Sequence, residues 1–228
     1  MLVTKNLVSN TIWFSLIMQI VTGLIPLRGF FITLPNEHKI LVDILALEVI
    51  VQFVEMIFYI WIAYAVMDIN KMASRRYIDW VITTPTMILS TIMFMKYQEQ
   101  KENGKLKSEP VETRDFLVEN RKSIISILIC NIGMLIFGYL GELKIISKYV
   151  AIPIGFAFFA KAFEGIYRDF GSKSKVGNLV FIFLFSVWSL YGVAAALPAN
   201  LKNVSYNLLD IIAKNFYGLY IYYQITLV

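Results

Sequence analysis

Long apolar segments, each near 20 residues and separated by short polar breaks, recur along almost the whole chain. A helix needs about 20 mostly apolar residues to cross the hydrocarbon core of a bilayer. Charged residues make up only 16% of the chain, whereas soluble domains carry about 25%. The 228 residues leave room for roughly seven spans and little else. The sequence therefore predicts an all-α membrane protein with a single domain, residues 1–228.

The polar breaks give the expected positions of the helices. We expect spans near residues 7–31, 39–67, 71–97, 117–140, 143–167, 175–197 and 203–226. The longest polar stretch, 98–115, is expected to be a solvated loop. About 12 Lys and Arg residues lie in or beside the loops after the first, third and fifth spans, against about 6 on the other side. The positive-inside rule then predicts an extracellular N-terminus, a cytoplasmic C-terminus and a cytoplasmic 98–115 loop.

Composition argues against several functional classes. Cys130 is the single cysteine and lies in an apolar run, so we expect neither an internal disulfide nor a metal site. The net charge is +5, but the basic residues gather in loops without interleaved aromatic residues. We therefore expect no nucleic-acid binding. Enzymatic activity is not expected either.

Among the charged residues inside the predicted spans, four matter most: Arg76, Asp79, Asp210 and Lys214. A charge at mid-membrane costs roughly 2.5 to 3.5 kcal/mol on insertion scales, so each one needs a partner and indicates function. Asp210 precedes Lys214 by one helical turn, and Arg76 similarly precedes Asp79, so each pair shares a helix face. A buried structural ion pair is the alternative interpretation of the pattern alone.

The sequences around these charges resemble the microbial rhodopsins. Arg76-Tyr-Ile-Asp79-Trp80-Val-Ile-Thr83-Thr84-Pro85 is similar to the third-helix signature of that family, and Leu209-Asp210-Ile-Ile-Ala213-Lys214 is similar to its retinal-attachment segment. Asn131-Ile-Gly133-Met134-Leu-Ile-Phe-Gly138 resembles the fourth-helix wall of the retinal pocket, where the family often has a carboxylate in place of Asn131. The resemblance implies a seven-transmembrane-helix bundle of the microbial rhodopsin type.

The resemblance also implies a chromophore and its surroundings. All-trans retinal would be attached to Lys214 as a Schiff base. Asp79 and Asp210 would be its counterions, and Arg76 would offset the second negative charge. The implied retinal pocket comprises Trp80, Thr83, Thr84, Pro85, Asn131, Met134, Gly138, Pro153, Gly155, Phe156, Phe185, Trp188 and Tyr191. The sixth helix lacks the usual Trp and Pro pattern of the family, which leaves the register of Phe185 and Trp188 open.

The third helix argues against an efficient proton pump. Outward pumps such as bacteriorhodopsin carry a carboxylate eleven positions after the first counterion, where this chain has Ser90. A hydroxyl is a poor proton donor near neutral pH. The triplet Asp79, Thr83 and Ser90 therefore favours a different transport mechanism.

The second helix favours a channel. Glu48, Gln52 and Glu55 are spaced i, i+4 and i+7 and share one face, and carboxylates along a wet pathway attract cations. Such glutamates resemble those of the channelrhodopsins and of the first group of viral rhodopsins, from giant algal viruses. That resemblance implies an ion pathway of Ser15, Glu48, Gln52, Glu55, Ser90 and Asn215. In it Glu55 is expected away from the Schiff base, in a constriction with Ser15 and Asn215. A dry interhelical hydrogen-bond network is the alternative.

The functional prediction is a light-gated cation channel. A light-driven outward proton pump is the main alternative, and a photosensory receptor is a third hypothesis. The expected partners are membrane lipid and monovalent cations or protons. The sequence leaves the oligomeric state open, although rhodopsins commonly form homo-oligomers with three or five subunits.

Overall fold

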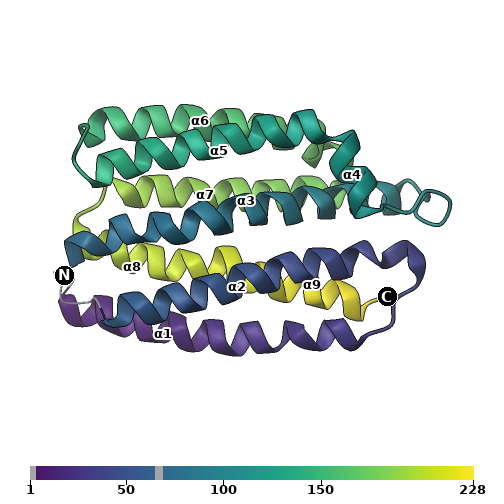
Figure 1. Cartoon of the computed structure of the whole chain (residues 1–228), viewed down its shortest axis with the longest axis horizontal. Helices are drawn as coiled ribbons and strands as arrows, with labels where there is room; N and C mark the ends of the chain where they lie inside the picture. Colours follow the sequence, from purple (N-terminus) through teal and green to yellow (C-terminus); the bar gives the residue numbers. More distant parts are fainter. Residues whose placement is uncertain (1–3, 65–68) are drawn as a thin grey trace.

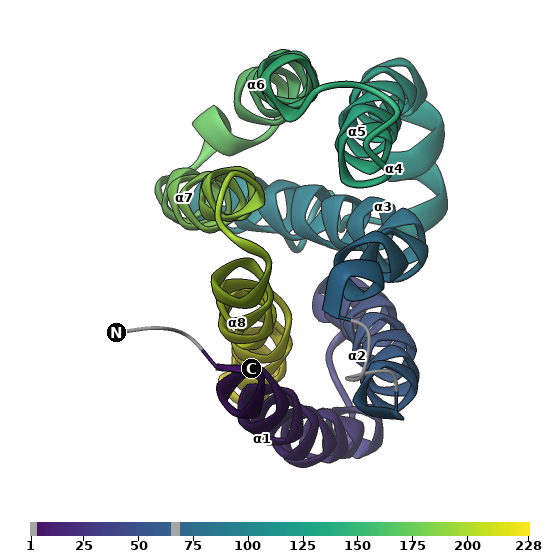
Figure 2. The ribbon, with the colours of Figure 1, turned by 90° about the vertical axis from the view of Figure 1, so that its left-hand side faces the viewer.

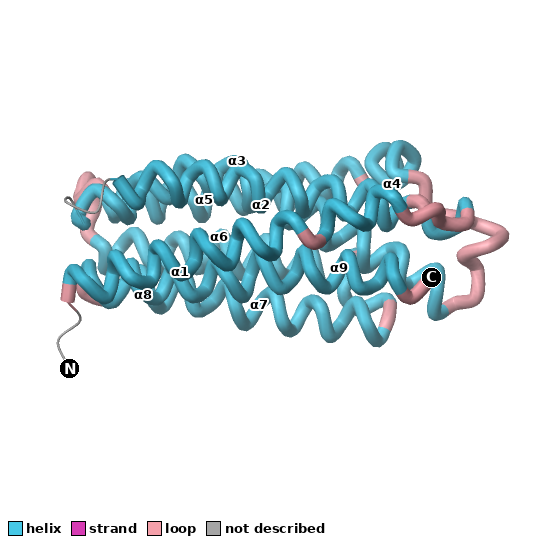
Figure 3. The backbone as a smooth tube through the Cα atoms, turned by 90° about the horizontal axis from the view of Figure 1, so that it is seen from below, coloured by secondary structure: helices cyan, strands magenta, loops and turns pink. Residues whose placement is uncertain are grey.

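The structure is a computed structural model that describes residues 4–64 and 69–228. In that part of the chain, Figure 3 shows helices joined by loops and turns. The long helices are α1 (Lys5–Leu24), α2 (Ile40–Tyr64), α3 (Ile69–Glu102), α5 (Arg121–Glu142), α6 (Lys148–Asp169) and α7 (Lys175–Ala195). A short α4 (Thr113–Glu119) precedes α5. The last segment consists of α8 (Ala199–Asp210), a π-helical turn (Ile211–Asn215) and α9 (Phe216–Thr226).

These segments form a closed ring in chain order. Each long helix contacts the next, and α8 returns to contact both α7 and α1. Figure 2 shows this ring end-on, and Figure 1 shows the two chain ends at opposite ends of the bundle. The described residues thus form a ring of seven helical segments, as the sequence predicts.

The surface of the bundle is suited to lipid. Large apolar side chains such as Phe14, Ile57 and Leu179 are more than half exposed. Within the described ranges 4–64 and 69–228, five helical segments are long and apolar enough to cross a membrane: Lys5–Phe31, Lys71–Glu102, Arg121–Glu142, Lys148–Lys173 and Lys175–Ala195. The other two, α2 and the α8–α9 segment, carry buried acidic residues and Lys214. Because lipid offers no hydrogen bonds to the backbone, helices are the conformation that such segments adopt.

Hydroxyl side chains begin three of these helices. Thr4 accepts a hydrogen bond from the backbone of Leu7 at the start of α1, and Ser147 and Ser174 cap α6 and α7 in the same way. Each satisfies a backbone N–H that the helix itself cannot pair. These caps fix where the spans begin and therefore the depth of their side chains in the bundle.

The structure corrects some predicted boundaries. The loop expected over 98–115 is shorter, because α3 continues to Glu102 and α4 begins at Thr113. The Glu102 carboxylate accepts hydrogen bonds of 2.7 and 2.9 Å from the backbone of Lys175 and Val176, which ties the end of α3 to the start of α7. The fifth span begins at Lys148 and not at 143, because a turn with Lys144 at a positive φ of 58° separates it from α5. The end predicted for the second span, residue 67, lies outside the described residues.

Candidate functional site

Lys214 lies at the centre of the bundle with three carboxylates around its amine. Its Nζ is 2.7 Å from Asp79 Oδ2, 3.4 Å from Glu55 Oε1 and 3.6 Å from Asp210 Oδ1. The Lys214 side chain is only 3% exposed, and the carboxylates are at most 1% exposed. The residue belongs to the π-helical turn, a distortion that often occurs at functional sites. The predicted partners Asp79 and Asp210 are therefore both beside Lys214.

Glu55 is the unexpected member of this cluster. The sequence-based prediction placed it away from Lys214, and the 3.4 Å contact shows that this placement was wrong. One face of α2 carries Glu48, Gln52 and Glu55, as predicted, but the third of these side chains reaches the level of Lys214. Depth along a neighbouring helix depends on how the two helices pack, which the spacing within α2 does not reveal.

Arg76 and Asp210 form a second buried ion pair. Arg76 Nη1 lies 2.9 Å from Asp210 Oδ2, and both side chains are fully buried. Arg76 also donates a hydrogen bond to Asn207. Hydroxyls of Tyr59 and Tyr191 donate to the two oxygens of Asp210 at 2.6 and 2.7 Å. Asp210 is thus held by an arginine and two tyrosines as well as facing Lys214.

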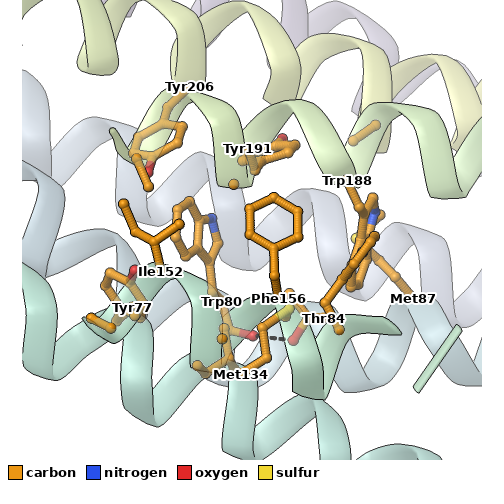
Figure 4. Close-up of a pocket in the computed structure, with 18 of the residues that line it drawn as sticks. Tyr77, Trp80, Thr84, Met87, Met134, Ile152, Phe156, Trp188, Tyr191 and Tyr206 are labelled. Atoms are coloured by element: carbon orange, nitrogen blue, oxygen red, sulfur yellow. Dashed lines mark hydrogen bonds between the residues drawn. The ribbon is translucent and has the colours of Figure 1, made fainter. Parts of the chain in front are cut away.

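A mainly apolar cavity extends from Lys214 between α3, α5, α6, α7 and α8. In the view of Figure 4 the ring of Phe156 projects between the indoles of Trp80 and Trp188. The lining residues are Tyr77, Trp80, Thr84, Met87, Met134, Leu135, Gly138, Ala151, Ile152, Gly155, Phe156, Phe159, Trp188, Tyr191, Gly192, Ala195, Tyr206, Ala213 and Lys214.

Eight of the predicted pocket residues line this cavity. They come from four helices and are Trp80, Thr84, Met134, Gly138, Gly155, Phe156, Trp188 and Tyr191. Trp80 packs edge-on against Tyr191 and Tyr206, with ring centroids 5.7 and 5.1 Å apart. At Gly192 an added Cβ would lie 2.3 Å from the Phe156 ring, so the glycine makes room for that aromatic wall.

The other five predicted pocket residues do not line the cavity. Pro153 is exposed on the outer face of α6, and Phe185 is 41% exposed and stacks on Phe159. Thr83 is buried and donates its hydroxyl to the backbone of Asp79, one turn back. Asn131 lies behind the lining residues and donates a 2.8 Å hydrogen bond to the hydroxyl of Thr84, which does line the cavity. Pro85 is half-buried in α3 and its ring is not part of the lining.

The predicted ion-pathway residues are all buried, but they bind different partners. Ser90 donates a hydrogen bond to the Glu48 carboxylate, and Ser15 donates to the backbone of Asn207 at 2.8 Å. Asn215 donates to Thr22 at 2.8 Å. The structure therefore pairs Ser90 with Glu48 across α2 and α3, whereas no hydrogen bond among the described residues joins Ser15, Glu55 and Asn215 to one another.

Sequence reasoning missed several residues of the site. Tyr59, Asn207 and Tyr206 surround Arg76, which lies 5.4 Å from the ring centroid of Tyr59 and 5.6 Å from that of Tyr206. Tyr59 falls one turn after Glu55 on the polar face of α2, and Asn207 falls one turn before Asp210. Tyr206 also falls one turn before Asp210, so extending each polar face by one turn would have found all three residues.

Comparison with known proteins identifies the family. A model of the bacteriorhodopsin-like protein family matches residues 10–228. The chain belongs to this family. Membership makes it an integral membrane rhodopsin and implies a retinal chromophore. A search of curated proteins found no match.

Solved rhodopsin structures share the fold over nearly the whole chain. The viral rhodopsin OLPVRII is 26% identical, with a TM-score of 0.78 over 97% of this chain and 99% of that chain. The blue light-absorbing proteorhodopsin from Med12 is 18% identical, with a TM-score of 0.73 over 96% of both chains. Halorhodopsin from Halobacterium salinarum is 12% identical, with a TM-score of 0.72 over 97% of this chain and 94% of that chain.

The residues of the cavity fit a retinal. The chromophore is a long apolar aldehyde, and this cavity combines aromatic walls with a single primary amine, that of Lys214. Asp79 Oδ1 is buried and has no hydrogen-bond partner among the described residues, so the site also retains an acceptor close to the amine. An apolar slot that ends at an amine flanked by carboxylates can hold a covalently attached, positively charged imine.

Proposed function

We propose that this rhodopsin is a light-gated channel for monovalent cations. The observation that carries the proposal is the buried polar face of α2. Glu48, Gln52 and Glu55 are at most 2% exposed, yet at least one side-chain oxygen or nitrogen of each lacks a hydrogen-bond partner among the described residues. Buried polar groups in dry interiors are nearly always paired. A row of unpaired groups through the bundle therefore supports a hydrated path, and its acidic members favour cations.

Lys214 is the proposed attachment residue, with Asp79 and Asp210 as counterions. When bound there, retinal supplies light absorption and a change of shape on illumination. Asp79 Oδ2, at 2.7 Å from the lysine nitrogen, is placed to accept a proton from that atom. Asp210 is held by Arg76, Tyr59 and Tyr191, so its role is to balance charge and to keep the network on its side of Lys214 closed.

The cluster contains one carboxyl group more than its cations can balance. Three carboxyls face two cations, Lys214 and Arg76. We assign a proton to Glu55, because its oxygens have no hydrogen-bond partner among the described residues, whereas Asp79 and Asp210 accept short hydrogen bonds. A neutral Glu55 brings the cluster close to zero net charge, which avoids the large cost of an uncompensated buried ion.

Glu55 also connects the chromophore to the ion pathway. It belongs to the polar face of α2 and lies 3.4 Å from the lysine nitrogen. A movement of that nitrogen therefore changes the surroundings of a pathway residue directly, without a relay through other helices. The proposed orientation has an extracellular N-terminus, so Glu48 and Gln52 lie on the cytoplasmic side of Glu55. The assignment to the first group of viral rhodopsins stays a prediction.

Photocurrents recorded at a series of membrane voltages test the channel. Passive flow reverses its direction with the driving force, whereas a pump keeps its sign. We expect the current to reverse, with a reversal potential that follows the gradient of sodium or potassium. Current that stays outward at every voltage would contradict the proposal.

Lys214→Ala tests the chromophore site. We expect loss of all visible absorption and of all photocurrent, because the cavity lining offers retinal no other amine with which to form an imine. Lys161→Ala is the matched control, since that lysine is 62% exposed and pairs with Glu164, three residues along the same helix, at 2.8 Å. A coloured, retinal-bound Lys214→Ala protein would contradict the attachment.

One observation favours the outward proton pump as a second candidate. Ser90 replaces the usual carboxylate on α3, but it donates a hydrogen bond to Glu48 on α2. A buried carboxyl group is therefore present at this level of the bundle, on the neighbouring helix, and a carboxyl can donate a proton where a hydroxyl cannot. If the protein pumps, Glu48→Gln slows reprotonation of the lysine nitrogen by about 100-fold or more, and flash spectroscopy would measure it.

A further inference from the structure

The carboxamide of Gln52 lies in an unusual position inside the bundle. The residue is 2% exposed, and neither its oxygen nor its nitrogen has a hydrogen-bond partner among the described residues. Leaving a buried amide unpaired is costly, because the group loses its hydrogen bonds to water and gains none in return. A leucine would fill a similar volume without that cost, so the amide is retained for something other than packing.

Two glycines on other helices enclose this carboxamide. A Cβ built at Gly218 on α9 would lie 2.0 Å from Gln52 Nε2, and one built at Gly23 on α1 would lie 3.5 Å from Gln52 Oε1. The amide therefore reaches across to the backbone of α9, and any larger residue at position 218 would displace it. This is a close approach of three helices around one polar group.

Further amide groups lie on the same helix faces. Gln19 precedes Gly23 by one turn on α1, is 1% exposed and has no hydrogen-bond partner for either amide atom within residues 4–64 and 69–228. Asn215 precedes Gly218 by three residues, and its Oδ1 is likewise buried and unpaired. We call Gln19, Gln52 and Asn215 the amide cluster. It contributes carboxamide oxygens to the space where α1, α2 and the last helical segment meet.

Within the amide cluster, Gln52 lies on the opposite side of Lys214 from Arg76. Along α2, Tyr59 contacts the Arg76–Asp210 pair and Glu55 contacts Lys214. Gln52 lies three residues from Glu55 on the side away from Tyr59, which is about 4.5 Å along the axis at 1.5 Å per residue. A cation that passes Glu55 therefore meets Gln52 before it meets Glu48.

We propose that the amide cluster is a constriction of the pore in which a monovalent cation exchanges part of its water shell for carboxamide oxygens, with Gln52 as the residue that determines ion preference. The inference rests on the proposed channel function. Neutral oxygen dipoles replace the hydration of sodium or potassium, whereas magnesium gives up its water reluctantly. Such a site passes monovalent ions and holds back magnesium.

Gln52→Leu tests the constriction, because it removes both polar atoms at nearly constant volume. We expect about tenfold less photocurrent, the effect of losing one polar contact to an ion. The absorption maximum should be unchanged, which also shows that the variant folds and binds retinal. Gln52→Asn keeps the amide but shortens the side chain, so it should conduct and shift the reversal potential measured with sodium on one side and potassium on the other.

Gly218→Ala tests the geometry independently. The added methyl group displaces the Gln52 amide, so the current should fall, and adding Gln52→Leu to the same chain should lower it little further, because both changes act on the same amide. Gly165→Ala is the matched control, because its added Cβ also meets a close neighbour, Ile127 at 3.0 Å, in a part of α6 remote from the amide cluster. We expect its current to equal that of the unmodified protein.

The outcomes separate the constriction from the channel itself. An unmodified protein without reversing current overturns both. A reversing current that Gln52→Leu leaves unchanged in size and in reversal potential overturns the constriction alone. An equal loss of current in Gly165→Ala and Gly218→Ala would overturn the geometric argument, because the effect would then be general to added methyl groups.

Discussion

The Glu55 carboxylate lies 3.4 Å from the Lys214 amine, and the Asp79 carboxylate lies 2.7 Å from it on the neighbouring helix. Both side chains are buried, so water screens neither contact strongly. Asp79 accepts a hydrogen bond from the amine, whereas the Glu55 oxygens accept none from the described residues. For these two acids we therefore propose different roles, Asp79 as counterion and Glu55 as a neutral pathway group.

This difference predicts the colours of two variants. Asp79→Asn removes a negative charge beside the protonated imine and should shift the absorption maximum strongly to longer wavelength. Glu55→Gln replaces one neutral group by another, so it should shift the maximum little while reducing the photocurrent. Visible spectra measure the shifts, and infrared difference spectra should show the protonated carboxyl band of Glu55 disappear. Equal spectral shifts in the two variants would contradict the assigned proton.

Phe156 and Phe185 should respond differently to truncation. Phe156 lines the cavity beside Gly192, whereas Phe185 is 41% exposed, stacks on Phe159 and does not line the cavity. Losing an aromatic contact costs about 0.5–1.5 kcal/mol beyond buried area, so Phe156→Leu should bind retinal about tenfold more weakly. Phe185→Leu should bind it normally. Titration of the apoprotein with retinal measures both affinities, and a weaker Phe185→Leu complex would place that residue in the pocket after all.

Tyr191→Phe should lower stability by about 1 kcal/mol, the usual net contribution of one hydrogen bond. The variant removes the 2.7 Å bond to Asp210 but keeps the ring that stacks on Tyr206. Thermal bleaching of the pigment measures the loss. Tyr223→Phe is the control, since that side chain is 54% exposed. A Tyr191→Phe protein as stable as the control would mean that the remaining donors to Asp210 compensate fully.

The pKa of His38, which lies outside the membrane-spanning segments, should be lower than its ordinary value. Burial beside Tyr97 lowers the pKa of His38 from 6.5, Lys101 and Lys107 lower it further, and Glu37 opposes them. A histidine whose pKa is lower in the folded than in the unfolded protein contributes to stability at pH values above its unfolded pKa. That contribution is lost as the pH falls through its folded pKa. The stability of the protein should therefore decline below about pH 6.5, and the stability of the His38→Gln variant should decline less. Nuclear magnetic resonance of the single histidine gives the pKa, and a value above 6.5 would reverse the sign.

The sequence by itself determined the helices and the main charged residues. Spans of about 20 apolar residues have one stable conformation in lipid, so the bundle followed from hydropathy. Lys214, Asp79 and Asp210 were recognisable because an ionisable group inside such a span requires a partner. The spacing of Glu48, Gln52 and Glu55 also predicted correctly that they share a buried face.

Only the tertiary structure decided which of these groups meet. The contact of Glu55 with Lys214, the bond between Ser90 and Glu48, and the exposed position of Phe185 all depend on how far each helix is rotated and shifted against its neighbours. Periodicity within one helix fixes its faces but not its depth beside another helix. Packing of side chains around the ring sets that depth, because a shift of one residue along the axis moves a side chain by about 1.5 Å and turns it by roughly 100°.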